Sequence, residues 1–257
     1  MTPDAEAALA AIRPRRPGQP QLWLFDYDGT LTPVVAHPSL ATLAPPVRQL
    51  LRRLAQQPAT AVGVVSGRRL DELRRLVDLP DLYYAGTGGM ELDLLGRLVT
   101  HPDAERIGAL IAQIAAALAP EAAAWPGAWV EPKPLGLTVH WRNLAADRHA
   151  AFRRTVDERL TPWRPAIQTF AGPMATEVLA RDGWDKGTAV EHIAADVGGD
   201  RPLLIYAGDQ DNDRHAFEAV AARHGVTIGI GPNAPPGATV SLADPAALQR
   251  LIEATTG

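Results

Sequence analysis

Two patterns of apolar positions alternate along this 257-residue chain. Short apolar runs at 22–25, 61–65 and 82–85 each end in Gly, Ser or acidic residues, which is typical of buried parallel strands. Between these runs, leucines and valines recur at helical spacing, and the same succession returns over residues 203–230. Strands that alternate with helices predict an α/β fold, in which a parallel sheet carries helices on both faces.

The middle of the chain has a different pattern. Ile and Leu recur at helical spacing over 104–118, whereas 129–142 and 166–180 alternate like half-exposed strands, with a helix between them. This pattern predicts a small α+β module inserted into the α/β core. We expect the module at residues 101–178 and the core at residues 1–100 and 179–257.

Charge and composition narrow the classes of function. The formal net charge of −4 leaves no basic excess, so we expect no nucleic-acid partner. The chain has no Cys, which excludes disulfides and thiolate chemistry. The first twenty residues lack an apolar signal core, and we find no run of the length that a membrane span needs. We therefore expect a cytoplasmic protein with no membrane partner.

An acidic pair follows the first predicted strand. Asp26 and Asp28 are separated by one residue on an extended segment, so their carboxylates point the same way, and Gly29 lets the chain turn. Two like charges so close together raise the pKa of one of the carboxyl groups, unless a hard cation such as Mg²⁺ compensates them. One aspartate can then attack phosphorus, and the other can act as acid and base. The alternative is a solvated turn after a strand.

The segment Asp26-Tyr27-Asp28-Gly29-Thr30-Leu31 resembles the signature of the haloacid dehalogenase superfamily of phosphatases. The resemblance implies a Rossmann-like hydrolase core, with the insertion as its large α+β cap. It also implies that Asp26 is the nucleophile and Asp28 the general acid/base. The Mg²⁺ ligands would be the Asp26 carboxylate, the Asp28 main-chain carbonyl and Asp209.

Two further positions suit phosphate binding. Ser66 ends the second predicted strand, where its hydroxyl and the backbone N–H groups near Gly67 can donate to phosphate oxygens. An N-cap of the following helix is the alternative for Ser66, and the superfamily resemblance favours phosphate binding. Lys186 stands at a predicted helix start, where the positive end of the helix dipole makes a cation unfavourable. There it could neutralise a phosphoryl group and Asp26.

Two loops invite other interpretations. Residues 208–213, Gly-Asp-Gln-Asp-Asn-Asp, suggest a calcium loop but lack the Gly and Glu of an EF-hand. They resemble the acidic motif of the superfamily, in which Asp209 is a metal ligand and Asp213 supports it. The Gly-rich segment 86–89 follows a strand, but no helical period follows it, which argues against a dinucleotide site.

The insertion carries the features that bear on the substrate. Glu131-Pro132-Lys133, then His140-Trp141-Arg142, then Glu177 and Trp184-Asp185-Lys186-Gly187 resemble the trehalose-6-phosphate phosphatase family in order and spacing. An ordinary exposed sheet face is the alternative. The resemblance implies sugar contacts, which we expect from Glu131, Lys133, His140, Arg142 and Glu177. We also expect Arg68 to be a substrate-binding residue. The predicted reaction is hydrolysis of trehalose 6-phosphate to trehalose and phosphate.

Two departures from the family pattern bear on the substrate. Gly88 stands where the family usually has His, and the acidic motif reads Gly-Asp-Gln-Asp-Asn-Asp, a form that resembles related sugar phosphatases. A sucrose, glucosylglycerol or mannosyl-phosphoglycerate phosphate is therefore the alternative ester. A non-catalytic sugar-phosphate sensor is the rival from another class, although the proposed catalytic residues are all present.

Overall fold

The computed structural model describes residues 3–14, 18–35, 37–172, 174–198 and 202–256. The chain divides into two compact units. The core unit comprises Met1–Val99 and Asp185–Gly257, and the cap unit comprises Thr100–Trp184. The cap unit extends beyond the predicted end at 178 because the last strand of its sheet continues to Ala180.

The core unit alternates strands and helices along the chain, as predicted. Its elements are α1 (Pro3–Ala11), β1 (Gln21–Phe25), α2 (Pro45–Ala55), β2 (Thr60–Val65), α3 (Leu70–Val77), β3 (Tyr83–Gly86), β4 (Glu91–Leu94), β5 (Arg97–Thr100), α6 (Lys186–Val197), β10 (Leu203–Gly208), α7 (Arg214–Ala222), β11 (Val226–Ile230), β12 (Val240–Leu242) and α8 (Pro245–Thr256).

Among the described residues, the core sheet has eight strands in the order β12-β11-β10-β1-β2-β3-β4-β5. From β12 to β3 each neighbouring pair is parallel, which confirms the predicted α/β class. Strand β4 runs antiparallel to β3, and β5 lies beyond it at the edge of the sheet; the sequence pattern predicted neither strand. The strands β10, β1 and β2 are neighbours, so their carboxyl ends lie at one edge of the sheet.

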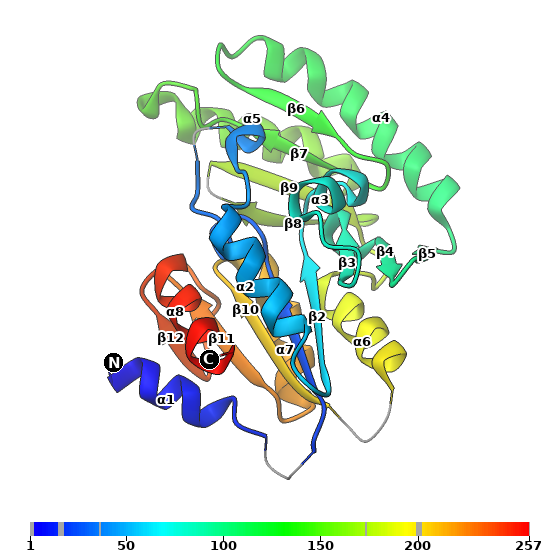
Figure 1. Cartoon of the computed structure of the whole chain (residues 1–257). Helices are drawn as coiled ribbons and strands as arrows, with labels where there is room; N and C mark the ends of the chain where they lie inside the picture. The colour runs from blue at the N-terminus through cyan, green and yellow to red at the C-terminus, as the bar shows by residue number, and fades with distance from the viewer. Residues whose placement is uncertain (1–2, 15–17, 36, 173, 199–201, 257) are drawn as a thin grey trace. The chain divides into compact units, whose positions relative to one another are not determined.

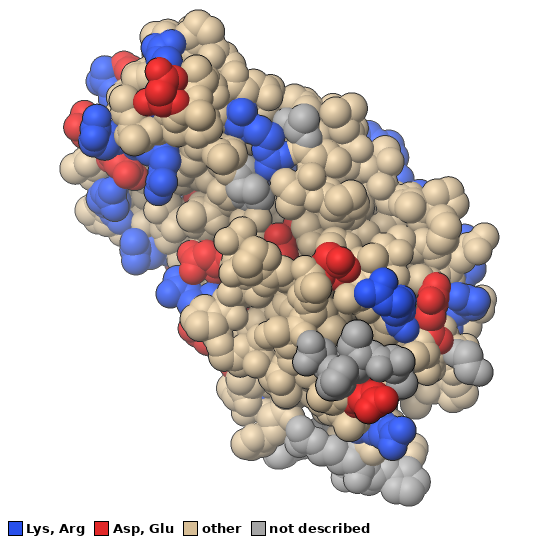
Figure 2. All heavy atoms as spheres, turned by 90° about the vertical axis from the view of Figure 1, so that its left-hand side faces the viewer, with Lys and Arg blue, Asp and Glu red and all other residues tan. Residues whose placement is uncertain are grey.

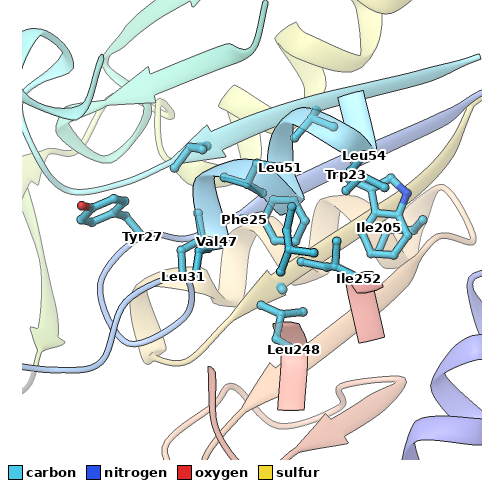
Figure 3. Close-up of a cluster of buried hydrophobic side chains, with 14 of the residues drawn as sticks. Trp23, Phe25, Tyr27, Leu31, Val47, Leu51, Leu54, Ile205, Leu248 and Ile252 are labelled. Carbon is cyan, nitrogen blue, oxygen red and sulfur yellow. The ribbon is translucent and has the colours of Figure 1, made fainter. Parts of the chain in front are cut away.

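Helices cover both faces of the core sheet, with α2 against α8 on one side and α6 against α7 on the other (Figure 1). Trp23, Phe25 and Tyr27 alternate along and beyond β1 and belong to the apolar cluster that side chains of α2 and α8 complete (Figure 3). The rings of Trp23 and Phe25 stack at 6.0 Å. Alternation therefore directs Asp26 to the opposite face, where α6 contacts β1.

The cap unit is an α+β module. Its elements are α4 (Ala104–Ala123), β6 (Trp129–Pro132), β7 (Gly136–His140), α5 (His149–Leu160), β8 (Ile167–Gly172) and β9 (Ala175–Ala180). The four strands form an antiparallel sheet in the order β6-β7-β9-β8. Phe152 and Val156 of α5 are buried, as are the isoleucines of α4, so each helix uses one apolar face for packing.

Helix α4 is the one helix in the described part of the chain that is long and apolar enough to cross a membrane, with a mean hydropathy of 1.2. The sequence pattern did not lead us to expect such a helix. Here Ile107, Ile111 and Ile114 are buried, and α4 contacts β6, β7 and α5. Its apolar side thus covers the cap sheet, and the absence of a membrane partner stays a prediction.

Charged side chains of both signs lie among one another on the face that Figure 2 displays, where most of the surface is uncharged. Surface ion pairs within each unit include Arg164 with Asp157 at 3.6 Å and Arg214 with Asp211 at 3.7 Å. This distribution agrees with the small net charge of −4. The absence of a nucleic-acid partner likewise stays a prediction.

Candidate active site

The ends of β1 and β10 bring three buried aspartates together in the core unit. Asp26 follows β1, Asp209 follows β10, and Asp213 ends the short 3₁₀ turn Asp211–Asp213. One carboxylate oxygen from each of these residues lies within 4.8 Å of the others. The backbone N–H of Asp26 donates to the carbonyl of Ala207 at 2.9 Å, so the pairing of β1 with β10 continues into the site.

Lys186 supplies the positive charge that these carboxylates need. Its side chain is only 2% exposed, and its Nζ donates to Asp26 Oδ1 at 2.6 Å and to Asp213 Oδ1 at 2.7 Å. A third contact reaches Asn212 Oδ1 at 3.3 Å. Lys186 is the first residue of α6, so the prediction that it stands at a helix start is confirmed. Three segments far apart in sequence therefore meet at one ammonium group.

Asp213 is surrounded by donors. Besides Lys186, the hydroxyl of Tyr206 donates to Asp213 Oδ1 at 2.8 Å. The backbone N–H groups of Asp209 and Gln210 donate to Asp213 Oδ2 at 3.0 and 3.2 Å. With both oxygens so engaged, Asp213 is suited to holding the Asp209 loop and Lys186 in place. The supporting role that we predicted for Asp213 stays a prediction.

Burial shapes the ionisation of the site. Burial raises the pKa of Asp26 well above its ordinary range, with Lys186 opposing and Asp213 and Asp209 adding to the rise. Burial, with the charge of Asp213, also raises the pKa of Asp209 to about 7. Burial alone would lower the pKa of Lys186. The negative charges of Asp213 and Asp26 outweigh this effect and raise the pKa, so Lys186 stays a cation. The site therefore favours additional positive charge.

The donor set fits a hard divalent cation. Carboxylate oxygens are ligands that Mg²⁺ prefers, and Asp26, Asp209 and Asp213 form a buried cluster that could hold a metal ion. Gly29 has a φ of 89°, and a Cβ there would overlap the carboxylate of Asp209, so a Gly is required where the loop after β1 approaches Asp209. Thr30 Oγ1 donates to Asp209 Oδ1 at 3.4 Å.

Asp28 is held by Arg68. The Nε of Arg68 donates to Asp28 Oδ2 at 2.7 Å, and its Nη2 donates to Asp28 Oδ1 at 2.9 Å. The Asp28 side chain is 42% exposed, whereas that of Arg68 is 6% exposed. We predicted Arg68 as a substrate-binding residue, and this stays a prediction. In the structure its donors point to Asp28, Glu72 and the carbonyl of Pro38.

Ser66 is buried at the end of β2. Its Oγ accepts from the backbone N–H of Arg68 at 3.2 Å, so its own proton can still be donated to a phosphate oxygen. Helix α3 begins at Leu70 with Arg69 as its N-cap, so Ser66 does not cap that helix. Gly67 lies between Ser66 and Arg68 and is partly buried.

The Gly-rich turn after β3 packs against the start of α6. Gly89 has a φ of 105°, and a Cβ there would overlap the carbonyl of Asp185. Asp185 is the N-cap of α6, and its Oδ1 accepts from the N–H groups of Gly187 and Thr188 at 2.8 and 3.0 Å. Its Oδ2 lies 2.6 Å from His215 Nδ1. The glycines of residues 86–89 thus permit close packing, and residues 91–94 form a strand in place of the helix a dinucleotide site needs.

In the cap unit, several predicted sugar contacts share one face of the sheet. Register pairs Glu131 with Thr138 and Thr138 with Glu177, which places these three on the same side. His140 Nε2 lies 2.7 Å from Glu131 Oε2, and Lys133 Nζ lies 3.8 Å from Glu177 Oε1. Two residues after His140, Arg142 is partly buried.

Sequence reasoning missed several residues that contact the site residues or their immediate neighbours: Thr30, Glu72, Asp185, Tyr206 and His215. Tyr206 belongs to an apolar strand, where nothing in the pattern separates a tyrosine that packs from one whose hydroxyl reaches a carboxylate. Asn212 also contacts Lys186, at 3.3 Å, which gives it a place in the site.

Fold and site together define a protein of the haloacid dehalogenase type, with a Rossmann-like core and a separate antiparallel cap sheet. The trehalose-phosphatase family profile matches residues 24–245. The chain belongs to the trehalose-phosphatase family.

Known relatives agree with this assignment. Over 230 residues, the chain is 35% identical to the trehalose-phosphate phosphatase of Mycobacterium tuberculosis strain H37Rv, which covers 88% of this chain and 57% of that protein. The chain thus spans a little over half the length of this curated relative. The C-terminal domain of Candida albicans trehalose-6-phosphate phosphatase has the same fold, with a TM-score of 0.84 at 20% identity over 93% of each chain. A structure of a trehalose-6-phosphate phosphatase related protein aligns with a TM-score of 0.76 at 23% identity, over 92% of this chain and 97% of the other.

Proposed function

We propose that this chain hydrolyses trehalose 6-phosphate to trehalose and phosphate, through an aspartyl-phosphate on Asp26 and with the help of Mg²⁺. The observation that carries the proposal is the Lys186 ammonium group held between Asp26 and Asp213, beside Asp209 and within a family-matched chain. Buried cations and a carboxylate nucleophile are what phosphoryl transfer needs, because its catalysis rests on positioning and charge stabilisation.

Asp26, Asp209 and the main-chain carbonyl of Asp28 would hold the Mg²⁺. When bound, the ion supplies charge neutralisation for the phosphoryl oxygens and for the crowded carboxylates. Asp213 would orient this set without joining it, since donors already engage both of its oxygens. Lys186, the Ser66 hydroxyl and the backbone around Gly67 would bind the remaining phosphate oxygens.

The proposed reaction has two steps. In the first, an oxygen of Asp26 forms a bond to phosphorus while the ester P–O bond breaks, and Asp28 gives a proton to the departing sugar oxygen. In the second, a water oxygen bonds to phosphorus, the bond between phosphorus and Asp26 breaks, and Asp28 takes the water proton. Asp26 and Asp28 therefore finish in their starting states.

The cap unit would select the ester. We propose that Glu131, Lys133, His140, Arg142 and Glu177 bind the sugar hydroxyls remote from the phosphate. Binding of remote groups can be used to position the reacting centre, so it raises turnover of the correct ester. A cytoplasmic location goes with this proposal, as a prediction.

Phosphate release from a panel of sugar phosphates tests the substrate. We expect trehalose 6-phosphate to have the highest kcat/KM, ahead of sucrose, glucosylglycerol and mannosyl-phosphoglycerate phosphates. Equal or better turnover of another ester would remove the trehalose assignment and leave the chemistry intact.

Replacement of the nucleophile tests the chemistry. Asp26→Asn should lower kcat by roughly 10³-fold or more, as loss of a nucleophile does, while the protein still binds substrate. Near-normal activity in this variant would refute Asp26 as the nucleophile. A wild-type chain that binds sugar phosphates without hydrolysing any of them would support the alternative of a non-catalytic sensor.

A further inference from the structure

Arg68 is a buried arginine beside the core site. Its side chain is 6% exposed, and its guanidinium group makes four hydrogen bonds within the core unit. Two go to the oxygens of Asp28, one to Glu72 Oε1, and one to the carbonyl of Pro38 at 2.7 Å. The group also lies over the ring of Tyr27, 5.2 Å from its centroid. These contacts determine both the position and the plane of the guanidinium group.

The contact with Asp28 is bidentate, and its two distances are 2.7 and 2.9 Å. Such a fork fixes the rotation of a carboxylate, which otherwise turns freely about its last torsion. Fixation matters here because the Asp28 side chain is 42% exposed, and burial alone would not hold it. Each carboxylate oxygen of Asp28 keeps a second lone pair beside its bond to Arg68.

Glu72 and Pro38 fix Arg68 in turn. Glu72 lies one turn along from Arg68, in the first turn of α3, and accepts from Nη1. Pro38 opens the 3₁₀ turn Pro38–Leu40 in the loop after β1. The position of Asp28 is therefore set through Arg68 by a helix and a loop, both outside the acidic cluster.

We propose that Arg68 is a positioning residue for the acid/base Asp28 and does not contact the sugar. The proposal rests on the proposed phosphatase chemistry but not on the identity of the ester. Its consequence depends on the leaving group. A sugar alkoxide needs a proton from Asp28 as it departs, whereas p-nitrophenolate is stable without one. The second step, in which water attacks, needs Asp28 for both esters.

The test uses the whole chain with Mg²⁺ and four variants: Arg68→Ala, Arg68→Lys, Asp28→Asn and the double variant Arg68→Ala/Asp28→Asn. For the best sugar phosphate, Arg68→Ala should lower kcat by about 10²-fold, the lower end of a general acid–base contribution, with KM changed less than about threefold. Arg68→Lys should be intermediate, because one ammonium group cannot form the fork. Arg69→Ala is the matched control, since Arg69 is exposed and pairs with Asp71.

The double-mutant cycle separates positioning from direct contact. If Arg68 acts through Asp28, Arg68→Ala should reduce kcat less than about threefold further in the Asp28→Asn background. An equal loss in both backgrounds would overturn the proposal, as would a raised KM with unchanged kcat. If Arg68→Ala does not fold, as judged by circular dichroism, Arg68→Lys and Glu72→Gln test the same point through the same kcat and KM pattern.

Pre-steady-state kinetics with p-nitrophenyl phosphate give a readout independent of the sugar. Arg68→Ala should keep a burst of p-nitrophenolate close to one equivalent and then turn over slowly, because only the second step needs Asp28. Loss of the burst would contradict the proposal. Failure of the trehalose assignment would leave this burst experiment unaffected, so the two failures are distinguishable.

Discussion

At the scale of single residues, the raised pKa of Asp209 predicts a pH dependence of stability. Its pKa is raised to about 7 by burial and by Asp213, from an ordinary value of 3.8. A carboxyl group with a raised folded-state pKa stabilises the protonated folded protein. That stability is fully present below the unfolded pKa and is lost as the pH rises through the folded value. The metal-free protein should therefore lose stability between about pH 4 and pH 7.

Magnesium should reverse this trend, because a cation replaces the proton. We expect the increase in Tm on adding Mg²⁺ to be small at pH 5.5 and several degrees at pH 8, since ~1 kcal/mol moves Tm by about 2–4 °C at this chain length. Thermal unfolding with EDTA and with Mg²⁺ at both pH values measures it. Asp209→Asn is the control and should abolish the Mg²⁺ effect. A Mg²⁺ effect that is equal at both pH values would contradict this reasoning.

The positions of site residues that directly follow a strand could be predicted from the sequence. Asp26, Ser66 and Asp209 each follow an apolar run, and neighbouring parallel strands bring them to one edge. The contacts of Arg68 and Tyr206 could not be predicted in this way. Both depend on where a long side chain ends after packing, and no periodicity in the sequence encodes that position.

Among the secondary-structure elements, α6 is the helix whose start matters for the site. Asp185→Ala removes the N-cap of α6 and should lower the free energy of unfolding by about 1 kcal/mol, and it should lower kcat because Lys186 is the next residue. Asp185→Asn keeps a good cap but loses the charge beside His215, so it should retain most of the stability. Chemical denaturation of the two variants measures the difference, and equal losses would refute the capping role.

Helices and buried strands with long periodic patterns were predicted well, whereas short edge elements were not. Strands β4 and β5 contain four residues each, and β12 contains three, too few to show a period. The cap strands were recognised because polar and apolar positions alternate over longer stretches. Strand β9 extends the cap unit past the predicted boundary because its last residues pair with β8, a contact that only the register reveals.

At the scale of the whole molecule, the two units divide the proposed work: the core unit carries the reaction, and the cap unit selects the ester. Small aryl phosphates have no sugar hydroxyls, so they should depend on the core unit alone. Substitutions on the face of the cap sheet that carries Glu131 and Glu177 should therefore affect sugar phosphates and aryl phosphates differently. Glu177 suits this test, because Glu177→Gln keeps the size of the side chain and removes the charge that lies beside Lys133.

We expect Glu177→Gln to lower kcat/KM for trehalose 6-phosphate by roughly 10–100-fold, as the loss of a charged hydrogen bond does, and to change kcat/KM for p-nitrophenyl phosphate by less than about twofold. Thr169→Ala is the matched control, since Thr169 is exposed on the neighbouring strand β8 and pairs with Val178, which puts it on the other face of the sheet. Steady-state kinetics on both substrates measure the effect. Equal losses on both substrates would mean that Glu177 supports the fold, and unchanged kinetics on both would exclude it from sugar binding.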